Sequence, residues 1–207
     1  MLTALIHGIA LAFGLILPLG AQNVFIFNQG ASQARFRKAI PVIVTASLCD
    51  TLLILLSVLG VSVIVLTIPA LQTALFSIGI LFLIYMGWSI WKSEPASLSQ
   101  NKDTNMSVKK GIMFAMSVSL LNPHAILDTV GVIGTSSLNY QGSAKVAFSL
   151  ACIIVSWMWF FGLALAGKIV GSFDNDGKFM RIVNKISALI IWSVAIYIGF
   201  QLYRLLG

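Results

Sequence analysis

Two aspartates and a histidine that stand inside long apolar stretches are the residues best suited to chemistry. Asp50 and Asp128 are two of only six acidic residues in the chain, and His124 precedes Asp128 by four positions. A carboxylate at the centre of a membrane helix costs about 2.5–3.5 kcal/mol on insertion scales, so such residues usually face a cavity. No Lys or Arg lies deep in these stretches. The pattern predicts a mobile cation, either a substrate or a proton; the alternative is a protonated aspartate that only bonds a neighbouring helix.

His124 suits a proton relay, because imidazole titrates near neutral pH. Its spacing from Asp128 can place both side chains on one helix face. A structural hydrogen bond to an opened backbone carbonyl explains His124 equally well. With that alternative kept open, we assign proton coupling to the three titratable residues Asp50, His124 and Asp128. Without a closely spaced ligand cluster, these residues are weak evidence for a metal ion, so neither a metal site nor a cofactor is predicted.

Helix breakers and amides form a second group of candidates, with Pro18, Gly20, Gln22 and Asn23 in one apolar stretch and Asn122 and Pro123 in another. Proline removes a backbone donor and clashes with the preceding turn, and lipid offers no replacement hydrogen bonds. The freed amide ends favour an anion such as a carboxylate. One proline alone would indicate a simple kink. Because each is followed five residues later by a polar side chain, we expect both interruptions to bind substrate.

Two tryptophans and two cysteines also stand inside apolar stretches. Trp157 and Trp159 lie away from the interfaces where aromatic belts belong, so they could form a cation–π wall of the substrate site. Packing against lipid is an equal alternative. Cys49 and Cys152 could serve a membrane thiol redox carrier, but neither belongs to a Cys-x-x-Cys pair. The sequence favours small buried hydrophobes for both.

Composition places these residues in a membrane protein. The 207-residue chain is 58% hydrophobic and 9% charged, against about 25% charged in a soluble domain. Six stretches reach the roughly 20 apolar residues that a spanning helix needs, at about 3–27, 39–66, 71–91, 111–134, 145–171 and 182–205. We therefore predict one all-α transmembrane domain over residues 1–207. No Lys or Arg precedes the first stretch, which favours a retained helix over a signal peptide.

The basic residues predict the orientation. All but Lys145 and Arg204 of the thirteen follow the first, third or fifth stretch. The positive-inside rule then puts those three loops in the cytoplasm and both termini outside. The basic residues form no continuous stripe, so a nucleic-acid partner is not expected.

An internal repeat is indicated by two pairs of motifs. Residues 85–92 and 197–204 both read Tyr-x-Gly-aromatic-x-x-aromatic-base, and the two proline motifs recur in the same order. Three spans per half is odd, so the second half must be inverted. We predict a 3+3 inverted repeat with broken helices one and four, halves at about 1–92 and 109–207, and a linker at 93–108. In such transporters the broken helices bind substrate near the bilayer midplane.

The two interruptions also carry a family resemblance. The first reads Leu17-Pro18-Leu19-Gly20-Ala21-Gln22-Asn23, followed by Asn28-Gln29-Gly30, and the second reads Asn122-Pro123-His124-x-x-Leu127-Asp128-Thr129. Both resemble signatures of the lysine/arginine exporters, the LysE/ArgO family, and so do Asp50, residues 159–165 and residues 181–184. The resemblance covers essentially the whole chain. Ala21 stands where the family commonly has a second proline, which would soften the local bend.

This resemblance implies export of arginine, lysine or both from a bacterial cytoplasm, driven by an ion gradient, and we expect proton antiport. No phosphate-binding loop of the Walker type is visible, which agrees with transport without ATP. The chain is expected to be a transporter and not an enzyme. The substrate carboxylate would bind beside Gly20 and Asn122 with help from Gln22 and Asn23, and its cationic groups would meet Asp50 and Asp128.

Three alternatives stay open: a related exporter of a neutral amino acid, a related exporter of a metal cation, and a membrane thiol redox carrier. The expected partners are a cationic amino acid and membrane lipid. The Gly167-x-x-x-Gly171 pattern can bring helices together but by itself says nothing about oligomers, so a homo-oligomer stays open.

Overall fold

The computed structural model describes residues 1–17, 20–33, 35–60, 68–92, 108–122, 125–126, 128–173 and 178–206. Within these ranges the chain is helical and has no strand, which confirms the all-α prediction. The helices are α1 (Leu2–Ile16), α2 (Ala21–Ser32), η1 (Phe36–Lys38), α3 (Ile40–Val58), α5 (Pro69–Trp91), α6 (Val108–Leu120), η3 (Asp128–Gly134), α8 (Thr135–Ser137), α9 (Gly142–Phe173) and α10 (Lys178–Leu206).

Three helices are individually long and apolar enough to cross a membrane: α3, α9 and the Arg181–Arg204 part of α10. Together, α1 and α2 would make a fourth span. The predicted third and fourth stretches coincide with α5 and with α6 plus η3, but the described parts of these do not qualify by the same criterion of length and hydropathy. The structure thus supports an integral membrane protein and leaves the count of six spans as a prediction.

The second predicted stretch was too long as a helix. It was expected to reach residue 66, whereas α3 ends at Val58. Gly60 follows with a φ of 82°, a left-handed conformation that glycine adopts readily and that commonly terminates helices. Residues 61–67 lie outside the described residues.

Both predicted helix interruptions are present. The axes of α1 and α2 differ by 80° across the break between Ile16 and Ala21. In the second half, α6 ends at Leu120 and the next long helical segment, the π-helical η3, begins at Asp128. Pro18, Pro123 and His124, which were expected to cause or flank these breaks, lie outside the described residues.

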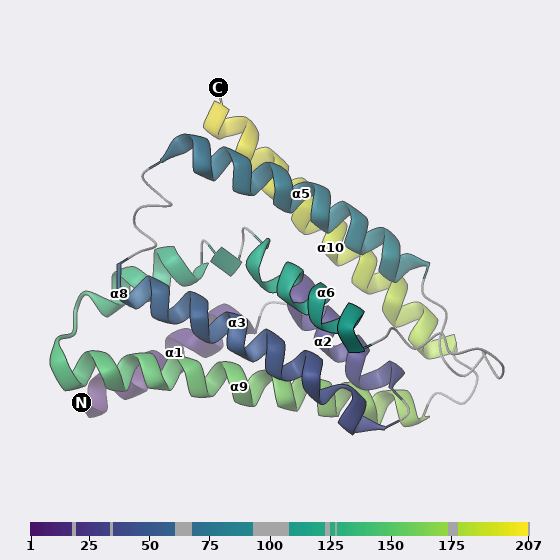
Figure 1. Cartoon of the computed structure of the whole chain (residues 1–207), viewed down its shortest axis with the longest axis horizontal. Coiled ribbons are helices and arrows are strands. Elements are labelled where there is room, and N and C mark those ends of the chain that lie inside the picture. Colours follow the sequence, from purple (N-terminus) through teal and green to yellow (C-terminus); the bar gives the residue numbers. More distant parts are fainter. Residues whose placement is uncertain are drawn as a thin grey trace.

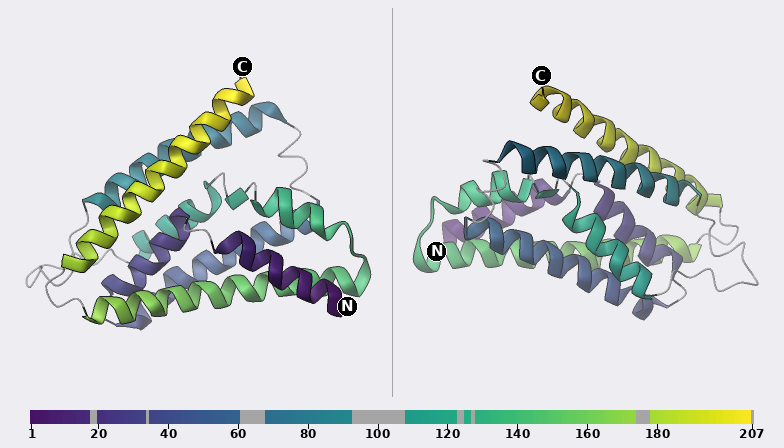
Figure 2. Two further views of the ribbon diagram at one scale, coloured as in Figure 1. Left: turned by 180° about the vertical axis from the view of Figure 1, so that it is seen from behind. Right: turned by 45° about the horizontal axis from the view of Figure 1, so that its top comes forward.

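The helices form two layers (Figure 1). Antiparallel α5 and α10 pack along each other at the upper edge, while α1 and α2 pack on α9, and α3 packs on α6, α9 and η3. Figure 2 shows the same pairing from two other sides. The segments α1 and α2 run in the direction opposite to that of α6, η3 and α8 (Figure 1). The two interrupted helices therefore meet in the interior with opposite polarity.

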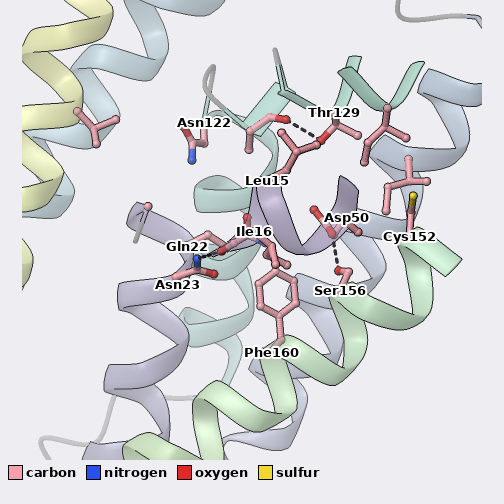
Figure 3. Close-up of a pocket in the computed structure, with 16 residues that line it drawn as sticks. Leu15, Ile16, Gln22, Asn23, Asp50, Asn122, Thr129, Cys152, Ser156 and Phe160 are labelled. Carbon is pink, nitrogen blue, oxygen red and sulfur yellow. Dashed lines mark hydrogen bonds between the residues drawn. The ribbon is translucent and has the colours of Figure 1, made fainter. Parts of the chain in front are cut away.

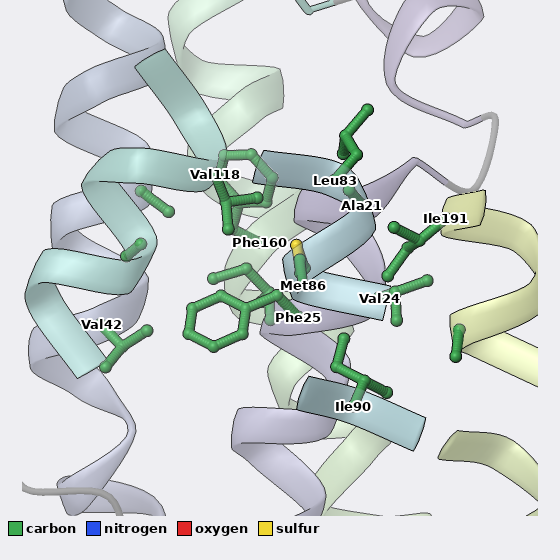
Figure 4. Close-up of a cluster of buried hydrophobic side chains, with 14 of the residues drawn as sticks. Ala21, Val24, Phe25, Val42, Leu83, Met86, Ile90, Val118, Phe160 and Ile191 are labelled. Carbon is green, nitrogen blue, oxygen red and sulfur yellow. The ribbon is translucent and has the colours of Figure 1, made fainter. Parts of the chain in front are cut away.

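The larger buried cluster joins the two layers (Figure 4). It includes Phe25 of α2, Val42 of α3, Leu83 and Met86 of α5, and Ile191 of α10. Many outward-facing side chains are also apolar, such as Leu48, Leu52 and Leu55 of α3. An apolar core with an apolar outer surface suits a lipid environment rather than water.

Glycines determine how closely α2 approaches α9. A Cβ atom on Gly30 would overlap the carbonyl of Ala164, and one on Gly167 would overlap the carbonyl of Phe27. Gly171 has a similar contact with Ala31. The Gly-x-x-x-Gly pattern thus serves a contact within this chain, between the first interrupted helix and α9.

Candidate functional site

A cavity of about 150 Å³ lies where the two interrupted helices meet α3 and α9 (Figure 3). Its polar lining consists of Gly20, Gln22, Asn23, Asp50, Asn122, Thr129 and Ser156. The apolar lining consists of Ala12, Leu15, Ile16, Ile54, Ala125, Ile133, Cys152, Phe160 and Val194. Five of the residues predicted to bind substrate, from both halves of the chain, therefore share one site.

Asp50 brings a carboxylate to this cavity from the middle of α3. The hydroxyl of Ser156, in the middle of α9, donates a hydrogen bond to Asp50 Oδ2 (Figure 3). Asp50 is half-buried and Ser156 is buried. A carboxylate held in this way can accept further hydrogen bonds from a cationic or protonated ligand.

Asn23 stabilises the break between α1 and α2. Its side-chain amide donates to the carbonyl of Ile16 at 2.7 Å. The last carbonyls of a helix have no amide donor on the following turn, so Asn23 supplies the donor that the break removes. The indole of Trp159 in turn donates to Asn23 Oδ1 at 3.2 Å. Asn23 thus belongs both to the cavity lining and to the support of the helix end.

Gln22 links the two interrupted helices directly. Its amide nitrogen donates to the hydroxyl of Ser119 near the end of α6, at 3.0 Å, and both side chains are buried. In the membrane interior such a bond joins groups that lipid cannot satisfy. The bond therefore fixes the start of α2 relative to the end of α6.

The start of α2 lies at the cavity, because Gly20, Gln22 and Asn23 are among the lining residues. Gly20 precedes the helix with φ −86° and ψ 174°, and as a glycine it has no side chain with which to cap the helix itself. These angles are open to any residue, so glycine is not needed for the backbone conformation. Apart from its chain neighbours, no atom of the described residues lies within 4 Å of where a Gly20 Cβ would stand. Gly20 therefore leaves space beside the helix N-terminus, which favours an anion.

The second interruption contributes Asn122 and Thr129. The carbonyl of Asn122 accepts the amide of Ile126 at 3.1 Å, which starts a new turn after the break. Thr129 lies in η3, where π-helical geometry frequently marks functional sites. Asp128 is the first residue of η3, and its side chain lies outside the described part of the structure.

The two predicted aromatic wall residues do not line the cavity. Trp157 donates to the hydroxyl of Thr51 at 3.0 Å and stacks on Phe161 with ring centroids 6.4 Å apart. Trp159 reaches the site only through Asn23. Among the lining residues, the aromatic side chain is that of Phe160.

Cys152, Ser156 and Phe160 were not predicted as substrate contacts, although their spacing of four places them on one face of α9. That spacing was a usable signal. Cys152 lines the cavity and Cys49 does not, and both thiols are free. The described residues contain no group of three or more His, Cys, Asp or Glu that could hold a metal ion.

Comparison with known proteins gives consistent results. Residues 13–202 match the family model of the LysE type translocators. The chain is 55% identical over 202 residues to a Bacillus subtilis (strain 168) protein named "Putative amino-acid transporter YisU", covering 98% of this chain and 91% of that protein.

More distant relatives carry a substrate in their names. The chain is 32% identical to the arginine exporter protein ArgO of Klebsiella pneumoniae (strain 342), covering 99% of this chain and 95% of that protein. It is 30% identical to ArgO of Serratia proteamaculans (strain 568), with coverage of 97% and 98%. No solved structure matches the chain.

Proposed function

This chain belongs to the LysE type translocator family, and we propose that it exports a basic amino acid, arginine or lysine, across the cytoplasmic membrane. That it is a membrane amino-acid transporter follows from the family. The choice of a basic substrate is supported by the named arginine exporters at about 30% identity and by the composition of the cavity.

The observation that carries the proposal is the pairing of opposite electrostatic features in one cavity. The start of α2, beside Gly20, favours a negative group, and the Asp50 carboxylate favours a positive one. An α-amino acid with a cationic side chain offers both charges. Its carboxylate would bind the first amides of α2, assisted by Gln22 and Asn23.

The cationic end of the substrate would bind Asp50, where Ser156 already orients one carboxylate oxygen. Asn122 and Thr129 supply neutral hydrogen-bonding groups across the cavity. We propose Asp128 as the second carboxylate and the prolines Pro18 and Pro123 as the breakers that open the two helices. Trp157 and Trp159 would act behind the cavity lining, Trp159 by holding Asn23.

Proton antiport would supply the energy for export. Moving one positive charge outward against an inside-negative potential costs about 2.3 kcal/mol per 100 mV. A carboxylate that binds either the substrate cation or a proton, but not both, couples the two movements in opposite directions. Asp50, Asp128 and His124 are the proposed proton-carrying residues.

The inverted repeat is part of the same proposal. Asp50 pairs with Ser156 and Thr51 pairs with Trp157, both 106 residues apart, and Pro18 and Pro123 are 105 apart. In the predicted repeat α1 corresponds to α6, and α3 corresponds to α9. The packing follows this correspondence, because α1 packs on α9 of the other half and α6 packs on α3. These features support halves at about 1–92 and 109–207 in six spans, with the basic loops in the cytoplasm.

A transport assay on purified protein in liposomes tests the function. Liposomes preloaded with labelled arginine, lysine or leucine, or with cadmium ion, would be diluted into unlabelled buffer with and without an inward proton gradient. We expect efflux of arginine or lysine that the gradient accelerates, and no efflux from protein-free liposomes. Efflux of leucine or cadmium alone would instead assign the chain to a neutral amino acid or a metal cation.

A further inference from the structure

One end of the α5–α10 pair combines exposed tryptophans with basic side chains. The Nζ atom of Lys92 lies 4.6 Å from the ring centroid of Trp88, and Nζ of Lys185 lies 5.5 Å from that of Trp91. Trp91 also stacks on Trp192 with centroids 5.6 Å apart. Both Trp88 and Trp91 are exposed. We refer to these five residues, together with exposed Arg181 one turn before Lys185, as the basic aromatic cluster.

A shallow, open hollow of about 400 Å³, which we call the groove, lies on one face of α10 next to this cluster. It is lined along α10 by Ile186, Leu189, Ile190, Ser193, Val194 and Tyr197. Its first residue follows Lys185 directly, and the run to Tyr197 extends about 16 Å at the helical rise. The hydrocarbon of one leaflet is about 15 Å deep. The groove therefore has the length and the apolar lining that suit one acyl chain.

We propose that the basic aromatic cluster and this groove bind one anionic phospholipid. Lys185 and Arg181 would bind the phosphate, and the indole of Trp91 would sit at the level of the glycerol and headgroup, where tryptophan is favoured. One acyl chain would lie in the groove against Leu189 and Tyr197. Charge complementarity selects an anionic lipid over a zwitterionic one, because the cluster contributes only positive side chains.

Val194 connects the proposed lipid site to the transport cavity. The same side chain lines the groove on the outside and the transport cavity on the inside. An acyl chain in the groove would support Val194 from behind and keep the cavity wall closed toward the bilayer. The binding site itself stands on the described geometry alone; the effect on transport rests on the proposed function.

Native mass spectrometry of the full chain tests the headgroup half of the site, with palmitoyl-oleoyl-phosphatidylglycerol and the matching phosphatidylcholine as probes. The wild type should retain one phosphatidylglycerol about tenfold more strongly than phosphatidylcholine. The Arg181→Gln/Lys185→Gln double variant should lose that preference. The Arg37→Gln/Lys38→Gln variant, which removes two exposed basic residues of η1, should keep it. Equal retention of both lipids, or equal loss in both variants, would overturn the proposal.

A second variant tests the groove separately. Ser193 lines the groove but not the cavity, and Ser193→Trp fills it while leaving the basic residues in place. We expect severalfold weaker phosphatidylglycerol retention with unchanged thermal stability, whereas Leu150→Trp on the exposed face of α9 should have no effect. A lipid-free dimer that Ser193→Trp dissociates would overturn the proposal in favour of a second copy in the groove.

Transport by the same variants separates this proposal from the proposed function. In phosphatidylglycerol liposomes, Arg181→Gln/Lys185→Gln should export arginine severalfold more slowly than the wild type. If the wild type exports no basic amino acid but still retains phosphatidylglycerol, the proposed function fails and the lipid site stands. If export is normal without selective retention, the lipid site fails.

Discussion

The two ends of α2 differ in how they are held. The half containing Gly30 packs backbone against backbone on Ala164 and Gly167 of α9, and Lys168 donates to the carbonyl of Gln33 at the helix C-terminus at 2.9 Å. The start of the helix is held by side-chain hydrogen bonds of Gln22 and Asn23, and space remains beside the backbone at Gly20. Gly30 therefore avoids a steric clash with α9, whereas Gly20 leaves space for a ligand beside the start of the helix.

This difference shows how a broken helix can present its amides to a ligand. The tight contact with α9 and the cation at the C-terminus stabilise α2 without using its first turn. Gln22 and Asn23 then fix the start of α2 to α6 and to the end of α1. The site is therefore open to a ligand while its supports remain packed.

The largest expected effect is in the C-terminal half of α2, where the helix packs closely on α9. Gly30→Ala places a methyl group on the carbonyl of Ala164, and backbone cannot move aside as a side chain can. Overpacking of this kind typically costs 1–3 kcal/mol and sometimes more, so we expect a markedly lower unfolding temperature and little folded protein. Thermal unfolding in detergent would measure it.

The control for this prediction is Gly14→Ala on α1. No described atom lies within 4 Å of its new methyl group, so stability should change little. Equal stability of the two variants would contradict the close α2–α9 contact.

An intermediate effect is expected at Asn23, which lies near the start of α2 and stabilises the break between α1 and α2. Asn23→Ala leaves the carbonyl of Ile16 without its side-chain donor. This bond is part-buried, so we expect a cost at the lower end of the roughly 1–3 kcal/mol of an unsatisfied buried group, and both the unfolding temperature and arginine transport should fall. Trp159→Phe, which removes only the 3.2 Å bond to Asn23, should show a smaller loss of both; a larger loss would mean that Trp159 has a separate role.

The smallest effect on folding, but a specific effect on transport, is expected at Gly20. Gly20→Ala is allowed by the backbone angles and meets no described atom, so thermal stability should be unchanged. The methyl group would occupy space proposed for the substrate carboxylate, and we expect a KM for arginine about tenfold higher, equivalent to roughly 1.4 kcal/mol. An unchanged KM would place the substrate elsewhere in the cavity.

The sequence was sufficient to predict the residues that are unusual inside a membrane helix. Asp50 inside an apolar stretch, and glycine and amides where a helix should continue, each stand out locally, and the structure places Asp50, Gly20 and Asn23 in one cavity. The helical class followed from composition. The end of α3 at Val58, followed by left-handed Gly60, did not follow from hydropathy, because the apolar pattern continues past it.

Contacts between helices distant in sequence could not be predicted in the same way. Ser156 looks like an ordinary small residue of a membrane helix, and its partner Asp50 is 106 positions away. The role of Trp159 depends on Asn23, 136 positions away. Such roles are set by how α3, α2 and α9 cross, which periodicity within one helix does not encode.

Arginine efflux by Asp50→Asn, measured beside the wild type in the same liposomes, tests the central claim most directly. The amide oxygen can still accept the Ser156 hydrogen bond, so the fold should be retained, while the negative charge is lost. Hydrogen bonds to charged groups contribute about 1.5–3 kcal/mol, so we expect at least a tenfold loss of efflux at unchanged unfolding temperature. Thr45→Ala, which removes a hydroxyl that donates within its own helix to the carbonyl of Pro41, should behave as the wild type. Full arginine efflux by Asp50→Asn would contradict a cation site at this carboxylate.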